Sequence, residues 1–277
     1  MNLTFTKMNG CGNDYIYCSG VNLPDPSNLA IKLTNRNTSI GGDGLVLITE
    51  SYRADAKMQM FNADGSEGLM CGNSIRCVGK YLYDQGIVKR LNMTIETASG
   101  VKPLTLIVED GEVTKACVNM GKPILAPGEI PVDFTGDMVV ARQVAIGGKP
   151  YEITCLSMGN PHAVIFNQDL AHANLQATGA AFEKSSLFPA GVNLSIVQTV
   201  TRKSLKMRVW ERGSGETKSS GTGACAAAVA AVLMGYADKN TEIQIQLEGG
   251  LLTVKYTDDA VYLTGDCATS YEGVVRI

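Results

Sequence analysis

The feature that most constrains the fold of this 277-residue chain is an internal repeat at an offset of 149 residues. Segment 42–48 aligns with 191–197, and segment 61–72 aligns with 210–221. The aligned residues include Phe61 with Trp210, Glu67 with Glu216, Gly72 with Gly221, Cys71 with Ser220 and, at an offset of 147, Gly12 and Asn13 with Gly159 and Asn160. Matches that occur in the same order along the chain, and at nearly the same offset, indicate a duplicated architecture.

The repeat divides the chain into two halves for which we expect one topology, residues 1–120 and 146–277, with 121–145 as linker and crossover. Apolar alternation and turn residues predict mixed α and β structure. The predicted elements are strands at 3–8, 15–18, 57–61, 93–97, 104–109 and 112–119, a turn followed by a strand within 41–49, helices at 28–35 and 72–85, and a helix from Gly221 to Gly235.

Charge and hydropathy exclude several classes of protein. The 24 basic and 27 acidic side chains nearly balance, which argues against a nucleic-acid-binding surface. The longest apolar run, 224–233, is too short and Ala-rich for a membrane span. Because residues 1–7 do not resemble a secretory signal, we expect a cytoplasmic protein.

The eight cysteines are expected to be reduced thiols rather than a disulfide framework. No pair has C-x-x-C spacing, and the two histidines, His162 and His172, have no cysteine or carboxylate cluster around them. We therefore expect no metal site.

Two helix starts are expected to meet at one ligand. Duplicated halves tend to pack as a symmetric dimer does, with equivalent elements face to face, so the helices from Gly72 and Gly221 are predicted to flank a pseudo-twofold cleft. Free backbone N–H groups at helix N-termini bind anions. A carboxylate is therefore the predicted ligand group.

Cys71 is the best candidate for a reactive side chain, because it stands directly before a predicted helix, where the macrodipole and amide donors stabilise a thiolate. The remaining cysteines are more simply interpreted as buried, inert thiols. Cys77 and Cys225 fall inside predicted helices, and Cys117, Cys155 and Cys267 fall in apparent strands.

Asparagines at glycine-bordered loop ends suggest a polar cage for a ligand, although each alone could be a turn or cap residue. They are Asn13, Asn62, Asn160 and Asn193. Glu211 and Arg212 offer an acid and a bidentate fork for an ammonium and a carboxylate, with a surface ion pair as the alternative. His162 is either a helper acid or base or a hydrogen-bonded structural residue in a loop.

The sequence contains no convincing cofactor-binding motif. Gly221-x-Gly223-x-x-Ala226 matches the dinucleotide fingerprint formally, but residues 215–220 before it are not a hydrophobic strand. The chain has no recognisable P-loop or pyridoxal phosphate motif, so we expect cofactor-free chemistry on a small-molecule substrate, with no nucleic acid or membrane partner.

Taken together, these residues resemble the diaminopimelate epimerase family of cofactor-independent amino acid racemases. The resemblance spans the chain and is highly specific. It rests on the motifs at 7–14, 41–44, 61–67, 70–73, 159–162, 191–193, 210–213 and 221–225.

The resemblance implies an α+β fold of two pseudo-symmetric domains, each a curved sheet around a central helix. It also implies a role in lysine biosynthesis, with LL-diaminopimelate converted to the meso form, and a homodimer as one assembly. In the family two cysteines transfer protons on opposite faces of the α-carbon. Their positions correspond here to Cys71 and Ser220. The carried-over substrate-binding residues are Asn13, Asn62, Gly72, Asn73, Asn160, Asn193, Glu211, Arg212, Gly221 and Thr222.

Ser220 is the main departure from the family pattern. A serine hydroxyl is a far weaker acid than a thiol, and the sequence identifies no base beside it, so two-base catalysis should be broken or severely slowed. The intact motifs around Ser220 favour a substitution made to obtain an inactive variant. Asn9, where the family usually has histidine, and Lys218-Ser219 also depart, which keeps open a racemase of another amino acid, such as histidine, and a non-catalytic amino acid binding protein.

Overall fold

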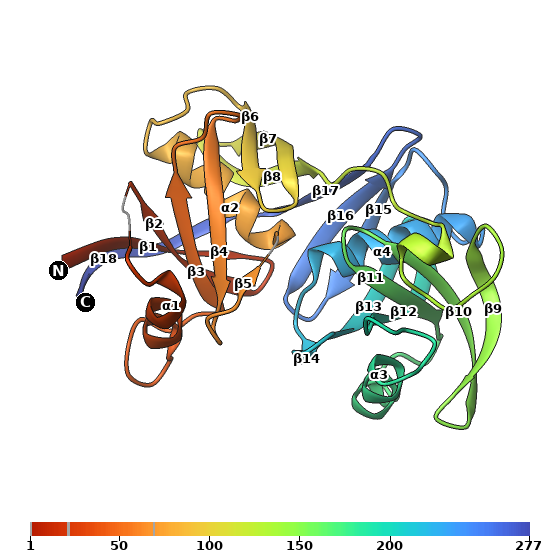
Figure 1. Cartoon of the computed structure of the whole chain (residues 1–277). Helices are drawn as coiled ribbons and strands as arrows, with labels where there is room; N and C mark the ends of the chain where they lie inside the picture. The colour runs from red at the N-terminus through yellow and green to blue at the C-terminus, as the bar shows by residue number, and fades with distance from the viewer. Residues whose placement is uncertain (1, 21–22, 69) are drawn as a thin grey trace. The chain divides into compact units, whose positions relative to one another are not determined.

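The computed structural model describes residues 2–20, 23–68 and 70–277 (Figure 1). The chain forms two compact units: unit 1 comprises Met1–Asn119 and Thr264–Ile277, and unit 2 comprises Met120–Leu263. Each unit has its own helices. None of the helices in the described ranges is long and apolar enough to cross a membrane.

Unit 1 contains β1 (Asn2–Gly10), β2 (Asn13–Ser19), α1 (Pro26–Thr34), β3 (Gly44–Thr49), β4 (Ala56–Asn62), β5 (Glu67–Gly68), α2 (Gly72–Asp84), β6 (Asn92–Thr97), β7 (Gly100–Glu109), β8 (Glu112–Asn119) and β18 (Ala268–Arg276). Strand β2 pairs in parallel with β3, and β4 pairs in parallel with β6, while β1–β2, β3–β4, β6–β7 and β7–β8 are antiparallel. Helix α2 contacts β1, β2, β7 and β8 and buries ten of its thirteen residues, so it is the central helix of this unit.

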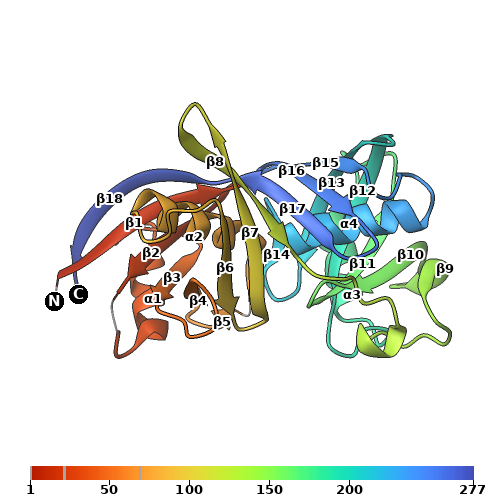
Figure 2. The ribbon, with the colours of Figure 1, turned by 90° about the horizontal axis from the view of Figure 1, so that it is seen from above.

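Unit 2 contains the 3-10 turn η1 (Pro127–Glu129), β9 (Val139–Ile146), β10 (Lys149–Ser157), β11 (Pro161–Phe166), α3 (Leu175–Glu183), β12 (Asn193–Thr201), β13 (Ser204–Glu211), β14 (Gly215–Thr217), α4 (Gly221–Leu233), β15 (Glu242–Leu247) and β16 (Gly250–Tyr256). Strand β17 (Val261–Asp266) crosses the boundary between the units. Helix α4 lies against β10–β13, β15 and β16, as the light-blue helix of Figure 2 shows.

The two units share one topology, which confirms the predicted duplication. Their parallel pairs correspond: β2–β3 and β4–β6 in unit 1 match β11–β12 and β13–β15 in unit 2. Each unit places one buried helix, α2 or α4, against a mixed sheet. The predicted fold class, two pseudo-symmetric α+β domains with a central helix in each, is therefore the fold observed.

The C-terminal segment lies in unit 1, so the structure departs from the predicted half 146–277. Strand β18 runs antiparallel to β1 from Asn2↔Arg276 to Asn9↔Ala268, and both views show the two strands side by side (Figures 1 and 2). The physical reason is that β2 pairs with only one edge of β1. The backbone groups along the other edge need hydrogen-bond partners, and β18 supplies them.

Residues 121–145 are not a linker. Ile130, Val132 and Val139 are buried in the core of unit 2, together with Phe182 and Phe188. Strand β9, which begins within this stretch, pairs antiparallel with β10. The apolar side chains, rather than the glycines and prolines, decide where this segment folds.

Candidate functional site

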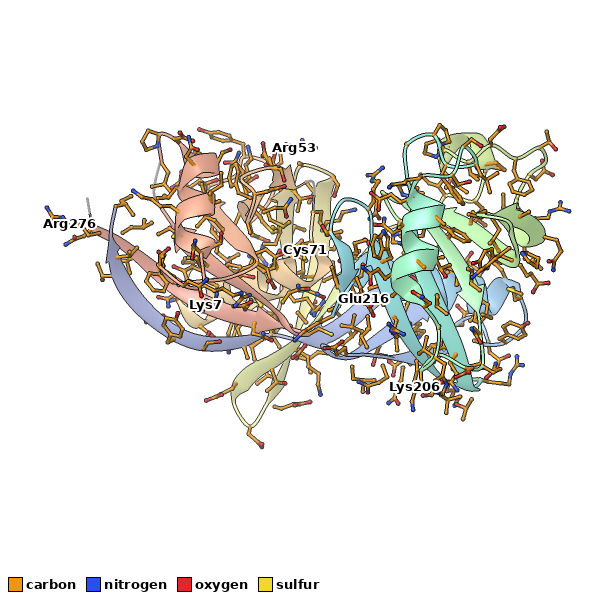
Figure 3. All side chains as sticks on the ribbon, turned by 90° about the horizontal axis from the view of Figure 1, so that it is seen from below. Lys7, Arg53, Cys71, Lys206, Glu216 and Arg276 are labelled. Carbon is orange, nitrogen blue, oxygen red and sulfur yellow. The ribbon has the colours of Figure 1, made fainter. Side chains whose placement is uncertain are left out.

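Cys71 is the N-cap residue of α2, as its position in the sequence predicted (Figure 3). Its side chain makes no capping hydrogen bond, its backbone is extended (φ −127°, ψ 120°), and it is half-buried. The Tyr15 hydroxyl donates a hydrogen bond to Cys71 Sγ across 3.8 Å. The sulfur therefore lies at the positive end of a helix dipole, and the Tyr15 hydroxyl beside it is a hydrogen-bond donor.

Four of the other thiols are scarcely ionised at neutral pH. Burial raises the pKa of Cys18, Cys155 and Cys267 to about 12 and that of Cys77 to about 11. Cys117, in β8, is half-buried like Cys71 but is not at a helix start. Cys267 lies between β17 and β18, so its predicted place in a strand is wrong.

Asn13 and Asn73 are brought together at the start of α2. Asn73 Nδ2 donates a hydrogen bond to Asn13 Oδ1, and Arg76 Nη1 donates to Asn73 Oδ1 at 3.1 Å and to the Gly72 carbonyl at 2.8 Å. Arg76 is fully buried and also donates from Nε to the Asp266 carbonyl at 3.1 Å. A buried arginine thus holds the loop that carries Cys71.

Arg76 was not identified from the sequence. It lies one turn before Lys80 on a helix, a spacing typical of a solvated charged face, so no local signal marks its side chain as buried. Its partner Asp266 lies 190 residues away, and the side-chain carboxylate of Asp266 accepts a hydrogen bond from Cys11 N at 2.8 Å. Spacing alone gives no reason to connect these residues.

An ionic cluster fixes the glycine-rich turn before β2. Lys7 Nζ lies 2.7 Å from Asp14 Oδ2, and Arg36 donates two hydrogen bonds to the Asp14 carboxylate at 2.5 and 3.1 Å. Asp43 accepts from Asn13 Nδ2 at 3.1 Å and from Arg36 at 2.9 Å. Although burial opposes the charged form, these donors hold the pKa of Asp14 below its usual value.

Asn62 lies at the end of β4, and the hydrogen bonds that it donates go to Ser66 rather than to the Asn13–Asn73 pair. Its Nδ2 donates to Ser66 Oγ at 3.0 Å, and its backbone N–H donates to the Ser66 carbonyl. These bonds close the turn 62–66, which supports the turn role that was the alternative interpretation of this residue.

Ser220 is the N-cap residue of α4, with backbone angles (φ −146°, ψ 114°) close to those of Cys71. Unlike the sulfur of Cys71, its Oγ accepts a capping hydrogen bond from Gly223 N at 3.2 Å. The same hydroxyl donates to Glu211 Oε2 at 3.0 Å. The expectation that no base lies beside Ser220 is wrong, because the carboxylate of Glu211, at the end of β13, accepts its hydrogen bond.

Glu211 is held by two hydroxyl groups. Thr217 donates to Oε1 at 2.6 Å, and Ser220 donates to Oε2. Burial raises the pKa of Glu211 above its usual value, against these two hydrogen bonds, which lower it. The alternative interpretation, a surface ion pair between Glu211 and Arg212, is not what the structure shows for this carboxylate.

Asn160 links the turn before β11 to the start of α4. Its Nδ2 donates to Thr222 Oγ1 at 3.3 Å, and its Oδ1 lies 2.9 Å from His162 Nε2. His162 lies in β11 rather than in a loop and is fully buried. Burial lowers its pKa to about 3, and the positive charge of Arg212 acts in the same direction. A neutral imidazole that donates to Asn160 fits the structural alternative.

Asn193 braces the loop that carries Arg212. Its Nδ2 donates to the Pro161 carbonyl and its Oδ1 accepts from Arg212 N, each at 2.9 Å. The Arg212 side chain is exposed and donates from Nη1 to the Ala190 carbonyl. Glu183, which the sequence did not single out, accepts from Trp210 Nε1 at 2.7 Å and from Gly213 N at 3.0 Å, and so supports the same turn.

The chemistry that these groups offer is proton transfer and anion binding. Unit 1 presents a thiol and unit 2 a hydroxyl, each at the N-terminus of a thirteen-residue helix. Within the described part of the chain, no three His, Cys, Asp or Glu side chains gather as a metal ion would require.

The sequence model of the diaminopimelate epimerase family matches residues 5–126 and 154–269. A diaminopimelate epimerase of Desulfovibrio desulfuricans is 48% identical over 98% of this chain and 97% of its own length. The diaminopimelate epimerase of Acetivibrio thermocellus is 46% identical over 99% of this chain and 99% of its own length. That of Methanococcus maripaludis is 43% identical over 99% of this chain and 100% of its own length.

Solved structures of lower identity share the fold. A probable proline racemase from Agrobacterium radiobacter, with bound carbonate, superposes with a TM-score of 0.75 at 15% identity, covering 99% of this chain and 92% of its own. A hydroxyproline epimerase from Agrobacterium vitis, with bound trans-4-hydroxy-L-proline, gives 0.73 at 14% identity with the same coverage.

Proposed function

Because the chain belongs to the diaminopimelate epimerase family, we propose that it is built to invert the α-carbon of diaminopimelate, from the LL to the meso form, without a cofactor. The observation that carries this proposal is the equivalence of Cys71 and Ser220. Both are N-cap residues of buried helices, α2 and α4, that occupy the same place in two units of one topology. Each helix N-terminus offers backbone N–H groups to a carboxylate.

In the proposed reaction the Cys71 thiolate removes the α-proton. The C–H bond breaks, an S–H bond forms, and the electron pair left on the α-carbon spreads into the substrate carboxylate. Amide groups at helix N-termini stabilise that charge. A proton delivered to the opposite face completes the inversion, and residue 220 is the group assigned to this step.

Ser220 makes the second step slow. The hydroxyl is a weaker acid than a thiol, and Glu211 beside it accepts its hydrogen bond. We therefore propose that the chain binds both stereoisomers and interconverts them very slowly. The motifs around position 220 are intact, and serine is close to isosteric with cysteine. This supports the proposal that Ser220 replaces a catalytic cysteine.

Assignment of the substrate-binding residues is part of the proposal. Asn73, Gly221 and Thr222 are assigned to the amino acid head. The other residues assigned to the substrate are Asn13, Asn62, Gly72, Asn160, Asn193, Glu211 and Arg212. In unit 2 the hydrogen bonds from Asn160 to Thr222 and from Arg212 N to Asn193 support a preorganised site. A homodimer is the proposed assembly.

A non-catalytic amino acid binding protein is a second candidate, favoured by the engagement of Ser220 Oγ in both a cap and a hydrogen bond to Glu211. A racemase of another amino acid, such as histidine, is a third, since Asn9 and Lys218 depart from the family pattern. Exchange of the α-proton in heavy water, screened over a set of amino acids, separates the two enzymes. Binding without any exchange, even in Ser220→Cys, supports the binding protein.

Restoring the thiol tests the proposal directly. Ser220→Cys should epimerise diaminopimelate without added pyridoxal phosphate or metal, and the product should carry deuterium at the inverted centre. Cys71→Ser in that background should abolish turnover, whereas Cys117→Ser, at the other half-buried thiol, should preserve it. The proposal fails if Ser220→Cys binds diaminopimelate and shows no exchange, or if the serine form epimerises rapidly.

A further inference from the structure

Two tyrosines on β2 point at the first turn of α2. Tyr15 and Tyr17 are two residues apart, so they lie on the same face of the strand. The Tyr15 hydroxyl donates to Cys71 Sγ at 3.8 Å, and the Tyr17 hydroxyl donates to the Ser74 carbonyl at 3.2 Å. Of the two phenols, Tyr15 donates its hydrogen bond to the reactive sulfur and Tyr17 donates to a backbone carbonyl, so Tyr17 is a natural control.

Gly44 makes room for the ring of Tyr15. The two residues are paired across β2 and β3. A Cβ atom at position 44 would lie 2.7 Å from Tyr15 Cε1 and 2.4 Å from the Phe61 carbonyl oxygen, both closer than real contacts allow. Tyr15 is only 6% exposed. The ring is thus packed over a residue without a side chain, and its hydroxyl is held at the sulfur.

We propose that Tyr15 is a positioning residue for Cys71: its phenol O–H holds the sulfur in one orientation and stabilises the thiolate by hydrogen bonding. A donor interacts more strongly with a charged sulfur than with a neutral thiol, so the bond favours the ionised form. The effect on the thiolate is independent of the substrate. Its consequence for turnover rests on the proposed function.

The other titratable groups near Cys71 do not compete for this role. Tyr17 on β2 and Cys77 on α2 both interact electrostatically with Cys71. Burial raises the pKa of Tyr17 well above its usual value and that of Cys77 to about 11, so both stay neutral near pH 7. Arg76, the nearby cation on α2, donates hydrogen bonds to Gly72, Asn73 and Asp266.

The test is the pH dependence of Cys71 alkylation by iodoacetamide, followed by peptide mass mapping without substrate. Tyr15→Phe should move the midpoint of the profile up by about one pH unit and slow alkylation below the midpoint about tenfold, because a charge-assisted hydrogen bond is lost. Tyr17→Phe, which removes a phenol of the same strand face, should leave the midpoint unchanged. An unchanged midpoint in Tyr15→Phe, or an equal shift in Tyr17→Phe, overturns the proposal.

In the Ser220→Cys background, Tyr15→Phe should lower kcat more than it changes KM. Because alkylation needs no substrate, its outcome stands even if diaminopimelate is not the substrate.

Discussion

The Ser220 hydroxyl donates a hydrogen bond to Glu211 Oε2 across 3.0 Å while it accepts one from Gly223 N at 3.2 Å. The same oxygen thus caps α4 and holds a carboxylate from β13. At the equivalent start of α2, the Cys71 side chain makes no capping bond. Exchange of serine and cysteine between these two positions should therefore change stability as well as chemistry.

Ser220→Cys should lower the free energy of unfolding of unit 2 by about 1 kcal/mol, because sulfur is a poor substitute for the capping oxygen. Packing alone predicts a smaller cost, since the two side chains are similar in volume. Urea unfolding followed by the fluorescence of Trp210, the single tryptophan, reports on this unit. Conversely, Cys71→Ser should raise the melting temperature by supplying the missing cap. A stabilised Ser220→Cys protein would contradict this account of the cap.

Cys71 should be the thiol that alkylating reagents modify first. Cys18 and Cys155 are buried, with pKa values raised to about 12, so their thiolates are scarce at neutral pH. Cys117 is the relevant control, because it is half-buried to a similar degree but lies in a strand. Mass mapping of the native protein after brief treatment gives the order of labelling. Faster labelling of Cys117 would show that exposure, rather than the helix N-terminus, governs reactivity.

Arg212→Lys should weaken diaminopimelate binding by about 1 to 3 kcal/mol, because lysine cannot reproduce a bidentate pair with the distal carboxylate. Isothermal titration calorimetry measures the effect. Arg202→Lys is the matched control in the same unit, since the Arg202 guanidinium already pairs with Asp238. If affinity is unchanged and an amino acid without the distal carboxylate binds better, another amino acid is the substrate.

Acidification should destabilise unit 2 through His162. Its pKa is lowered from 6.5 to about 3 in the folded protein, so between these values the unfolded chain binds a proton that the folded chain does not. The free energy of unfolding should fall by up to about 1.4 kcal/mol per pH unit over this window, and no contribution is expected above pH 6.5.

Urea unfolding by Trp210 fluorescence at several pH values measures this slope. His162→Gln, which can still donate to Asn160, should reduce it, whereas His172→Gln, at the exposed second histidine, should not. An identical slope in the His162 variant would assign the acid sensitivity to other groups.

The amino-acid sequence determined the duplication, the paired helix starts and the cysteine at one of them. These features are local. Glycines at the ends of elements and the spacing of apolar residues are set within a few residues, whatever the rest of the fold. For the same reason the bounds predicted for the helix at 72–85 differ from those of α2 by one residue.

Only the tertiary structure decided which distant groups meet. The placement of β18 beside β1, the contact of Tyr15 with Cys71 and the bond from Ser220 to Glu211 join elements whose spacing carries no signal. Strand pairing satisfies backbone groups that any sequence carries, so the choice of partner depends on the whole core. The side chains that face one another then follow from strand register, which is why the carboxylate beside Ser220 emerged only from the fold.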